Sequence, residues 1–243
     1  MPATGRVLVT GVSRRRGIAA AVTARLRKDG WVVFTTGWRL YDAGMPWGRD
    51  DEQAVDLEDD LSDPEAPARI VAAAESVAGP LTALVNIHTV DTGGGLLDMT
   101  PELIDRHLVV SVRATLLLMG EFVRRFRESR PTGGGRIVTF TSRLPQTGAI
   151  AYAASKGAIE WLTVSAATEL GGDGITVNAV NPGPTQSGWM TAEIEKEVAA
   201  RTPLGRVGRP EDAAALVAFL LSTEGGWVNG QVISSDGGHS VGA

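Results

Sequence analysis

The sequence predicts an α/β fold, namely a doubly wound, seven-stranded parallel sheet with helices on both faces, in a single domain. Two observations support this fold class. Short runs rich in β-branched residues alternate with longer helical patterns, and the short runs are apolar on both faces, as are strands that helices cover from two sides. The length of 243 residues also lies within the range of one α/β domain.

Six runs are predicted as strands, at residues 6–10, 31–36, 81–86, 136–141, 175–180 and 231–234. A weaker run at residues 54–57 adds the seventh strand. Helical periodicity covers residues 18–28, 65–77, 101–127, 152–170 and 210–221. Residues 37–50 contain two tryptophans, a proline and three glycines, and we expect them to form an irregular surface excursion rather than a linker between domains.

The composition argues against several classes of function. A net charge of −5 offers no basic face for nucleic acid, and no apolar run approaches the ~18 residues of a membrane span. The chain has no cysteine, and its three histidines lack the spacing of metal ligands, so no metal site is expected. No export signal is visible at the start of the chain, which predicts a cytoplasmic protein.

The first predicted strand runs into a glycine-rich turn that leads directly into a helix. The turn includes Gly11, Ser13, Arg16 and Gly17, and the helix begins at Ile18. Such a turn presents free backbone N–H groups and the positive end of the helix dipole, which together bind a pyrophosphate. Glycine turns also occur for steric reasons alone. This turn therefore indicates a pyrophosphate site only in combination with the features described next.

A second feature is the pair Tyr152 and Lys156 at the start of a predicted helix. Their spacing of four residues puts the phenol and the ammonium on one helix face. Because a cation favours the phenolate, Lys156 is expected to lower the pKa of Tyr152 from about 10 toward working pH, which makes the tyrosine a general acid/base. Ser142, at the end of the strand before this helix, can hydrogen-bond the same substrate oxygen.

Together these features resemble the short-chain dehydrogenase/reductase family, and the resemblance covers essentially the whole chain. It depends on an ordered set of motifs: the glycine turn, Asp60-Leu61-Ser62-Asp63, Asn86, Ser142, Tyr152-x-x-x-Lys156, Asn178-Ala179-Val180-Asn181-Pro182-Gly183, and residues 203–212 and 230–238.

The resemblance implies a Rossmann-type fold and a role for each of these residues. Tyr152 is then the general acid/base and Ser142 positions the substrate oxygen. Lys156 lowers the pKa of Tyr152 and holds the nicotinamide ribose. The implied cofactor-binding residues are Gly11, Ser13, Arg16, Gly17, Ile18, Trp38, Arg39, Asp60, Leu61, Asn86, Tyr152, Lys156, Thr185 and Ser187.

The chain departs from the family pattern near the site. Its glycine turn is two residues longer than the common form and resembles that of enoyl reductases. Ile159, however, stands where those enzymes carry their lysine, which favours ketone or alcohol chemistry. Tyr152 follows Ser142 by only ten residues, a shorter interval than is common in the family. We therefore expect a different shape at the entrance to the substrate site.

Two further departures concern the proton path. The usual Asn-Asn-Ala-Gly reads Asn86-Ile87-His88-Thr89, so His88 is expected beside the cofactor, either with a functional role or as simple space filling. The family's asparagine in the long helix is Ser111, whose hydroxyl we expect to hold the water that connects the lysine to solvent.

The expected cofactor is NADP(H), with NAD(H) as the weaker alternative. The second strand ends in residues 36–39 without the acidic side chain that binds an unphosphorylated ribose. Arg39, with one of the arginines at positions 14–16, is expected to bind the 2′-phosphate, and Trp38 to stack on the adenine. A solvated loop is the other interpretation of these arginines.

The leading interpretation is an NADP(H)-dependent reductase of a keto or related carbonyl group, similar to the 3-oxoacyl reductases. One alternative is an NAD-dependent alcohol dehydrogenase of the same fold. Another is a cofactor-binding protein with a regulatory or non-redox role, which the changes at residues 86–89 and at Ser111 motivate.

Two expectations concern the surface. Residues 186–203, with Trp189 and Met190, are expected to form a substrate lid with an apolar mouth. The resemblance implies a homotetramer in which two long helices pair with their copies, and residues 116–119 and 158–167 offer apolar or small faces for this.

Overall fold

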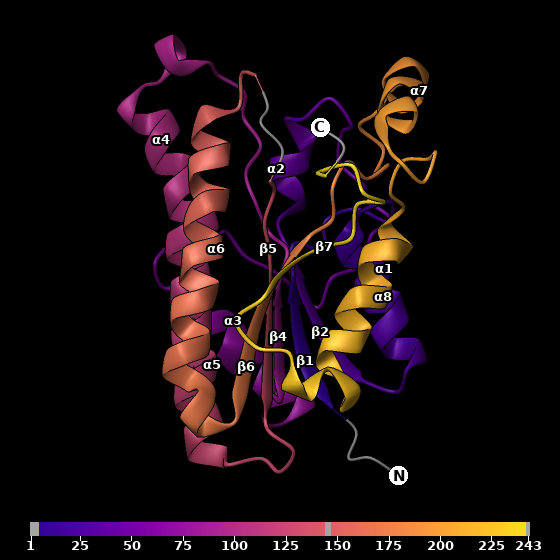
Figure 1. The fold of residues 1–243 in the computed structure, drawn as a ribbon. Helices are drawn as coiled ribbons and strands as arrows, with labels where there is room; N and C mark the ends of the chain where they lie inside the picture. Colours follow the sequence, from indigo (N-terminus) through magenta and orange to yellow (C-terminus); the bar gives the residue numbers. More distant parts are fainter. Residues whose placement is uncertain (1–4, 144–146, 242–243) are drawn as a thin grey trace.

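The computed structural model describes residues 5–143 and 147–241 of the chain. At its centre is one sheet of seven parallel strands in the order β3-β2-β1-β4-β5-β6-β7 (Figure 1). The predicted doubly wound α/β fold is therefore confirmed. The strands are β1 (Arg6–Thr10), β2 (Val32–Gly37), β3 (Leu57–Glu58), β4 (Ala83–Asn86), β5 (Gly135–Phe140), β6 (Ile175–Asn181) and β7 (Val232–Ser234).

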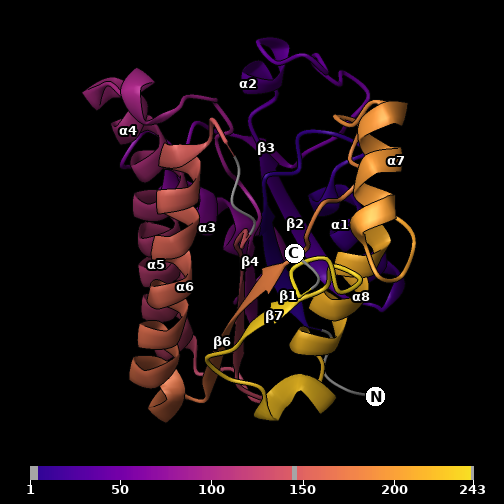
Figure 2. The same cartoon turned by 45° about the horizontal axis from the view of Figure 1, so that its top comes forward.

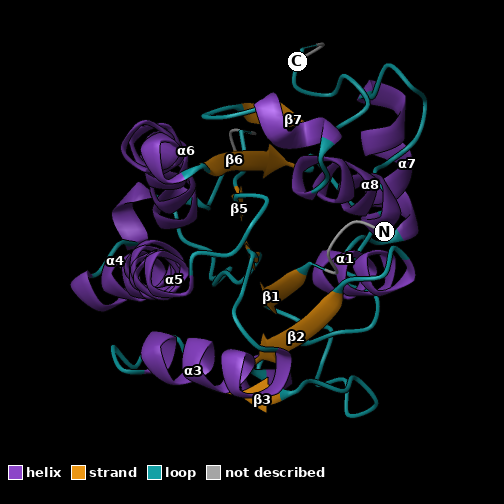
Figure 3. Cartoon of the chain, turned by 90° about the horizontal axis from the view of Figure 1, so that it is seen from below, coloured by secondary structure: helices purple, strands orange, loops and turns teal. Residues whose placement is uncertain are grey.

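Helices cover both faces of the sheet, which Figure 3 shows from below. On one face lie α3, α5 and α6, and on the other α1 packs against α8. Three further helices, α2, α4 and α7, stand around the end of the molecule that the carboxyl ends of the strands face (Figure 2). The helices are α1 (Ile18–Lys28), α2 (Arg39–Ala43), α3 (Ala66–Ala78), α4 (Pro101–His107), α5 (Ala114–Ser129), α6 (Ile150–Leu170), α7 (Ala192–Arg201) and α8 (Pro210–Leu221).

Alternate residues of the central strands enter two separate cores. In β1, Leu8 packs into the core beneath α3 and α5, whereas Val7 and Val9 pack into the core beneath α1 and α8. All three side chains are fully buried. A strand that is buried on both faces is apolar at every position, which is why the sequence pattern located these strands to within two residues.

Three predicted segments differ from the structure. The helix expected over residues 101–127 is interrupted by a π-helical stretch, Leu108–Arg113, in which the buried residue is Ser111. Residues 37–50, expected to be irregular, contain the short helix α2. Residues 186–203 contain α7, which was not predicted and none of whose residues is buried.

The strands end together at one edge, where the direction of winding changes. β1 lies between β2 and β4, and the chain adds strands outward from β1 first in one direction and then in the other. At such a switch point the loops that follow neighbouring strands diverge and leave a crevice, which is the usual ligand site of doubly wound folds. A pocket of about 960 Å³ lies there.

Candidate active site

The pocket at the carboxyl edge gathers predicted site residues from distant parts of the chain. They come from the turns after β1, β2, β3 and β5, from the start of α6, and from the segment after β6. The predicted site residues that line the pocket are Gly11, Ser13, Gly17, Ile18, Trp38, Asp60, Leu61, Ser142, Tyr152, Thr185 and Ser187.

The remaining predicted residues lie behind or beside this wall. Asn86, Ser111 and Lys156 are buried, with exposed fractions of 3%, 1% and 4%. Arg16 is exposed and lies beside Gly188, where an added Cβ would stand 3.8 Å from Arg16 Cδ. Arg39 forms an ion pair with Glu58 of β3.

The turn after β1 is shaped to hold an anion against the backbone. Gly11 has φ +78°, and a Cβ there would lie 2.7 Å from the backbone nitrogen of His88, so only glycine fits. Gly17 immediately precedes α1, has an extended backbone and provides no side-chain cap. The first turn of α1 has no acidic residue. The free N–H groups and the helix dipole therefore favour a negatively charged group, and these residues fit the pyrophosphate of a dinucleotide.

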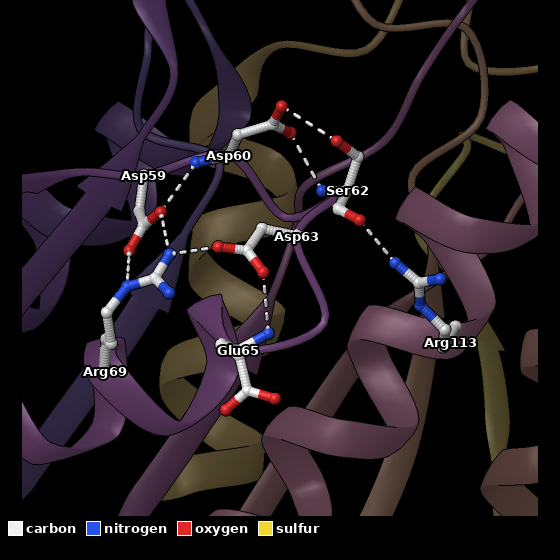
Figure 4. Close-up of polar contacts among 7 residues, drawn as sticks. All are labelled: Asp59, Asp60, Ser62, Asp63, Glu65, Arg69 and Arg113. Carbon is white, nitrogen blue, oxygen red and sulfur yellow. Dashed lines mark hydrogen bonds and ion pairs between the residues drawn. The ribbon is translucent and has the colours of Figure 1, made fainter.

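One end of the pocket is bounded by Trp38 and by the turn after β3. The backbone N–H of Trp38 donates to Ser13 Oγ at 3.1 Å, which links the end of β2 to the glycine turn. Leu61 supplies an apolar wall. The Asp60 carboxylate accepts hydrogen bonds from the backbone and hydroxyl of Ser62, both at 2.8 Å (Figure 4). Asp60 therefore shapes the turn that presents Leu61.

Arg69 fixes this turn from the first turns of α3. Its guanidinium is bonded to Asp59 at 2.8 Å and to Asp63 at 2.7 Å, as Figure 4 shows. Arg113, from the end of the π-helical stretch, donates to the main-chain oxygen of Ser62. The turn after β3 is thus bonded to α3 and to the π-helical stretch.

Arg14 connects the glycine turn to the segment after β6. Its guanidinium donates to the main-chain oxygen of Ser187 at 3.1 Å and lies 4.4 Å above the ring of Trp47. It also lies 3.5 Å from the carboxylate of Asp42, which accepts a hydrogen bond from Trp47 Nε1 at 2.7 Å. Burial raises the pKa of Asp42 and lowers that of Arg14.

Asp42 is a pocket residue that the sequence reasoning missed. It is only 4% exposed and lines the pocket near Trp38. It was missed because it lies beyond the end of β2, in a segment expected to be irregular. The signal available in the sequence was the position of this acidic residue between Trp38 and Trp47.

The other arginines of this region are also paired with carboxylates. Arg15 lies 3.0 Å from Asp50 and is also paired with Glu52. Arg39 donates to the main-chain oxygen of Gln53 at 3.1 Å in addition to its contact with Glu58. A 2′-phosphate would therefore compete with these carboxylates for the guanidinium groups.

Ser142, Tyr152 and Lys156 meet at the opposite end of the pocket. Lys156 Nζ donates to the main-chain oxygen of Phe140 at 3.2 Å and lies 5.5 Å from the centroid of the Tyr152 ring. Ser142 lines the same pocket as Tyr152, and its hydroxyl opposes the effect of burial by lowering the pKa of Tyr152. Three of the four residues predicted to be catalytic are therefore neighbours in space, and the fourth, Ser111, is buried in the π-helical stretch.

The expected lowering of the Tyr152 pKa is not what the structure shows. Burial, with a smaller contribution from the charge of Asp91, raises the pKa of Tyr152 to about 12. Burial also lowers the pKa of Lys156 to about 8. The prediction considered only the ammonium, whereas the desolvation of the phenol is the larger effect here.

His88 is held between the end of β1 and the start of α5. Its Nδ1 lies 2.6 Å from the hydroxyl of Thr10, and its Nε2 lies 3.4 Å from the hydroxyl of Thr115. Thr115 donates its own hydrogen to the main-chain oxygen of Ser111 at 2.8 Å, so we assign the imidazole proton to Nε2. Burial, and then the charge of Lys156, lower the pKa of His88 to about 3. His88 is therefore a neutral ring that links the end of β1 to the start of α5.

A second group of polar side chains lies at the end of β4 and in the π-helical stretch. Ser111 Oγ is 3.4 Å from the hydroxyl of Thr89. The amide oxygen and nitrogen of Asn86 are both buried without a hydrogen-bond partner among the described residues. Buried amides without protein partners are usually hydrated, which makes this a place for an ordered water.

Comparison with known proteins identifies the family. A family model described as Enoyl-(Acyl carrier protein) reductase matches residues 11–240. The chain belongs to the short-chain dehydrogenase/reductase family. This short-chain dehydrogenase/reductase is accordingly an oxidoreductase, and the resemblance inferred from its motifs is confirmed.

Relatives of this short-chain dehydrogenase/reductase match over nearly their whole length. It is 38% identical over 242 residues to the uncharacterized oxidoreductase YjdA of Bacillus subtilis, covering 95% of each chain. It is 33% identical over 269 residues to an NADPH-dependent aldehyde reductase-like chloroplastic protein of Arabidopsis thaliana, covering 98% of this chain and 96% of the relative. A solved structure of a short-chain dehydrogenase from Burkholderia cenocepacia in complex with NADP has a TM-score of 0.82 and 35% identity, covering 97% of this chain and 98% of that one.

Two features are absent from residues 5–143 and 147–241. No group of three histidine or carboxylate side chains there is arranged to hold a metal ion. No helix in these ranges has the length and apolar character needed to cross a bilayer.

Proposed function

We propose that this short-chain dehydrogenase/reductase uses NADP(H) to interconvert a carbonyl group and an alcohol, as a ketoreductase. One observation carries the proposal: Ser142 and the hydroxyl of Tyr152 share a pocket with the uncapped start of α1. An acid/base pair and an anion site at opposite ends of one crevice suit a dinucleotide with a small carbonyl compound beside it.

The residues that would hold the dinucleotide are those along the pocket wall. The backbone from Gly11 to Ile18 would bind the pyrophosphate, Trp38 and Leu61 would flank the adenine, and Thr185 with Ser187 would hold the nicotinamide end. When bound, the nicotinamide supplies or accepts the hydride. Arg39, with one of the arginines at positions 14–16, would bind the 2′-phosphate, which would have to displace the carboxylate of Glu58 from Arg39. The NADP complex of the Burkholderia relative supports this cofactor preference.

The protein's own groups would manage the proton and the substrate oxygen. Ser142 holds the carbonyl oxygen by a hydrogen bond, and Tyr152 donates its proton to that oxygen as the alcohol forms. Lys156 stabilises the resulting phenolate through its charge. The unpartnered amide of Asn86 and the hydroxyl of Ser111 would hold the water that returns a proton to this site.

We further propose that residues 186–203 are a lid over the substrate and that the protein is a cytoplasmic homotetramer. The lid is supported by Trp189 and Val198, which line the pocket. The tetramer is supported by exposed apolar side chains on α5 and α6, among them Leu116 and Trp161.

The test is a comparison of both nicotinamides with three substrate classes. NADPH oxidation is followed with a panel of ketones and aldehydes, NADP⁺ or NAD⁺ reduction with the matching alcohols, and NADPH oxidation with a crotonyl thioester. The proposal predicts turnover of ketones with NADPH and a lower Kd for NADPH than for NADH. Preferential turnover of alcohols with NAD⁺ would indicate the alcohol dehydrogenase, and preferential turnover of the thioester would indicate an enoyl reductase. Cofactor binding without turnover of any class would indicate the non-redox role.

A further inference from the structure

The loop after β4 is fixed in place by three different elements. The backbone N–H of Asp91 donates to the Tyr41 hydroxyl of α2 at 2.9 Å. His107 at the end of α4 bonds the hydroxyl and the main-chain oxygen of Thr92, at 2.9 and 3.1 Å. The N–H of Gly94 donates to the main-chain oxygen of Gly148 at 2.6 Å, just before α6. The position of Asp91 relative to the start of α6 is therefore set by the protein before any substrate enters.

The carboxylate of Asp91 has no evident structural purpose. It makes neither a hydrogen bond nor an ion pair with any residue in the described ranges, although the other acidic residues that line the pocket, Asp42, Asp59 and Asp60, all do. Asp91 is exposed and lines the same pocket as Tyr152 and Ser142. Its charge also reaches the reacting groups, because it raises the pKa of both Tyr152 and Lys156.

We propose that Asp91 determines substrate specificity by binding a hydroxyl or ammonium group carried next to the reacting carbonyl. This inference rests on the proposed carbonyl chemistry and narrows it to α-hydroxy and α-amino carbonyl compounds. A rigidly placed, unpaired carboxylate attracts a hydrogen-bond donor and repels a carboxylate or phosphate at the same position. The same charge disfavours α-keto acids as substrates.

Two structural roles that a carboxylate could have in this loop, capping a helix and fixing the loop, are filled by other groups. A capping role is filled in this loop by Asp98, which accepts from the N–H of Gly95 at 2.8 Å. A role in fixing the loop is filled by the backbone of Asp91 and by Thr92, not by the carboxylate. What remains for the carboxylate is the pocket that Asp91 lines together with Tyr152 and Ser142.

Four small ketones of matched size test the proposal: aminoacetone, hydroxyacetone, methoxyacetone and pyruvate. Each is reduced with saturating NADPH at slightly acidic pH, where the amine is protonated, by the wild type and by Asp91→Asn. The aminoacetone-to-pyruvate ratio of kcat/KM is expected to fall roughly ten- to a hundredfold in the variant, which is the effect of one charge-assisted contact. The value for methoxyacetone, which has neither donor nor charge, should change less than about twofold.

Asp105→Asn is the matched control. Asp105 is exposed on the neighbouring helix α4 and does not line the pocket, so its replacement removes the same charge without touching the substrate space. All four ketones should respond to this variant as to the wild type. An unchanged aminoacetone-to-pyruvate ratio in Asp91→Asn, or an equal change in Asp105→Asn, would overturn the proposal.

A pH profile separates a direct role from a merely structural one. Tyr152 is faced by Asp91 from the β4 loop, Ser142 after β5, His107 from α4 and Lys156 on its own helix. Removing the Asp91 charge lowers the pKa of Tyr152 and of Lys156. The alkaline limb of methoxyacetone reduction should therefore move to lower pH in Asp91→Asn. A lower rate with an unmoved limb contradicts the role.

The failure of the proposed function is distinguishable from the failure of this inference. If none of the four ketones is reduced, the carbonyl chemistry is wrong. Saturation-transfer NMR then measures binding of the same four ketones to the NADPH complex of the wild type and of Asp91→Asn. An identical binding order in the two proteins would refute the specificity role independently of turnover.

Discussion

At the scale of single residues, Tyr152 is held in surroundings that keep its phenol protonated. Its pKa is raised to about 12, first by burial and then by Asp91. A protonated phenol is the form that donates to a carbonyl oxygen, whereas alcohol oxidation requires the phenolate. In the protein without cofactor, the electrostatics around Tyr152 therefore favour carbonyl reduction over alcohol oxidation.

The roles of Tyr152 and Lys156 are separable by substitution. Tyr152→Phe should lower kcat roughly 10²–10⁴-fold, because only the proton donor is lost while the ring still packs. NADPH affinity should stay within a factor of about two in this variant, whereas Lys156→Ala should weaken both turnover and binding. Stopped-flow turnover and calorimetric titration measure the two quantities. A phenylalanine variant that kept more than about a tenth of the rate would refute the acid/base assignment.

Ser111 is the residue at which the proton path departs most from the family. If its hydroxyl holds a water, Ser111→Ala should slow the chemical step roughly five- to a hundredfold, because a buried water loses one of its partners. Ser111→Asn should preserve or raise kcat by restoring an amide. The measurement is kcat against pH with a saturating ketone. An alanine variant that matches the wild type at every pH removes Ser111 from the mechanism and leaves Asn86 as the group to test.

At the scale of elements, the sequence pattern located the strands and helices that pack into the core. It did not locate α7, which has no buried residue. β1 and α8 were located to the residue because their apolar positions report contact with the core. The helix α7 has no buried residue and was not predicted, although Thr191, which caps Ile194 N–H, and the acidic residues that follow are the usual signs of a helix start. The π-helical stretch was not predicted either, because a local change in hydrogen-bond pattern within a long helix has no distinct signal in the sequence.

The same limit applied to the candidate site. Tyr152, Lys156, Ser142 and the glycine turn were predictable because their spacing along the chain already encodes their geometry. Asp42 and the fixed position of Asp91 were not, because they depend on contacts with Arg14 and Tyr41 that only the tertiary structure creates.

Arg14 joins two elements, the turn before α1 and the segment before α7. Arg14→Ala should raise the Kd for NADPH roughly tenfold, since a charged donor near the phosphate site is lost. It should also speed amide hydrogen exchange in residues 186–191, because the bond to the Ser187 carbonyl is gone. Arg25→Ala, which removes an exposed arginine paired with Asp29 on α1, serves as the control. Unchanged exchange in residues 186–191 would show that Arg14 does not hold this segment.

At the scale of the whole molecule, one face carries apolar side chains that the single chain does not cover. On α5 and α6, which lie side by side in Figure 3, Leu116 is 52% and Trp161 is 76% exposed, whereas Leu118 and Met119 belong to the core. Only part of the segment predicted as an oligomer face is therefore available for contact with another copy. Light scattering should give about 100 kDa for the wild type and a smaller mass for Trp161→Glu, because a charge opposes burial of this surface. A wild-type mass of a single chain would exclude the tetramer.

The packing of α1 against α8 has a consequence for how the protein is made. The two helices are separated by about 180 residues of chain, yet each supplies the apolar surface that covers the other. At the usual speed of a ribosome, α1 waits roughly 10 to 40 seconds for α8 to be synthesised. Val22 and Leu26 are meanwhile open to solvent and to chaperones. A chain released before Pro210 would keep this surface bare, so truncated products of the gene are expected to be cleared or to aggregate rather than accumulate as a smaller folded protein.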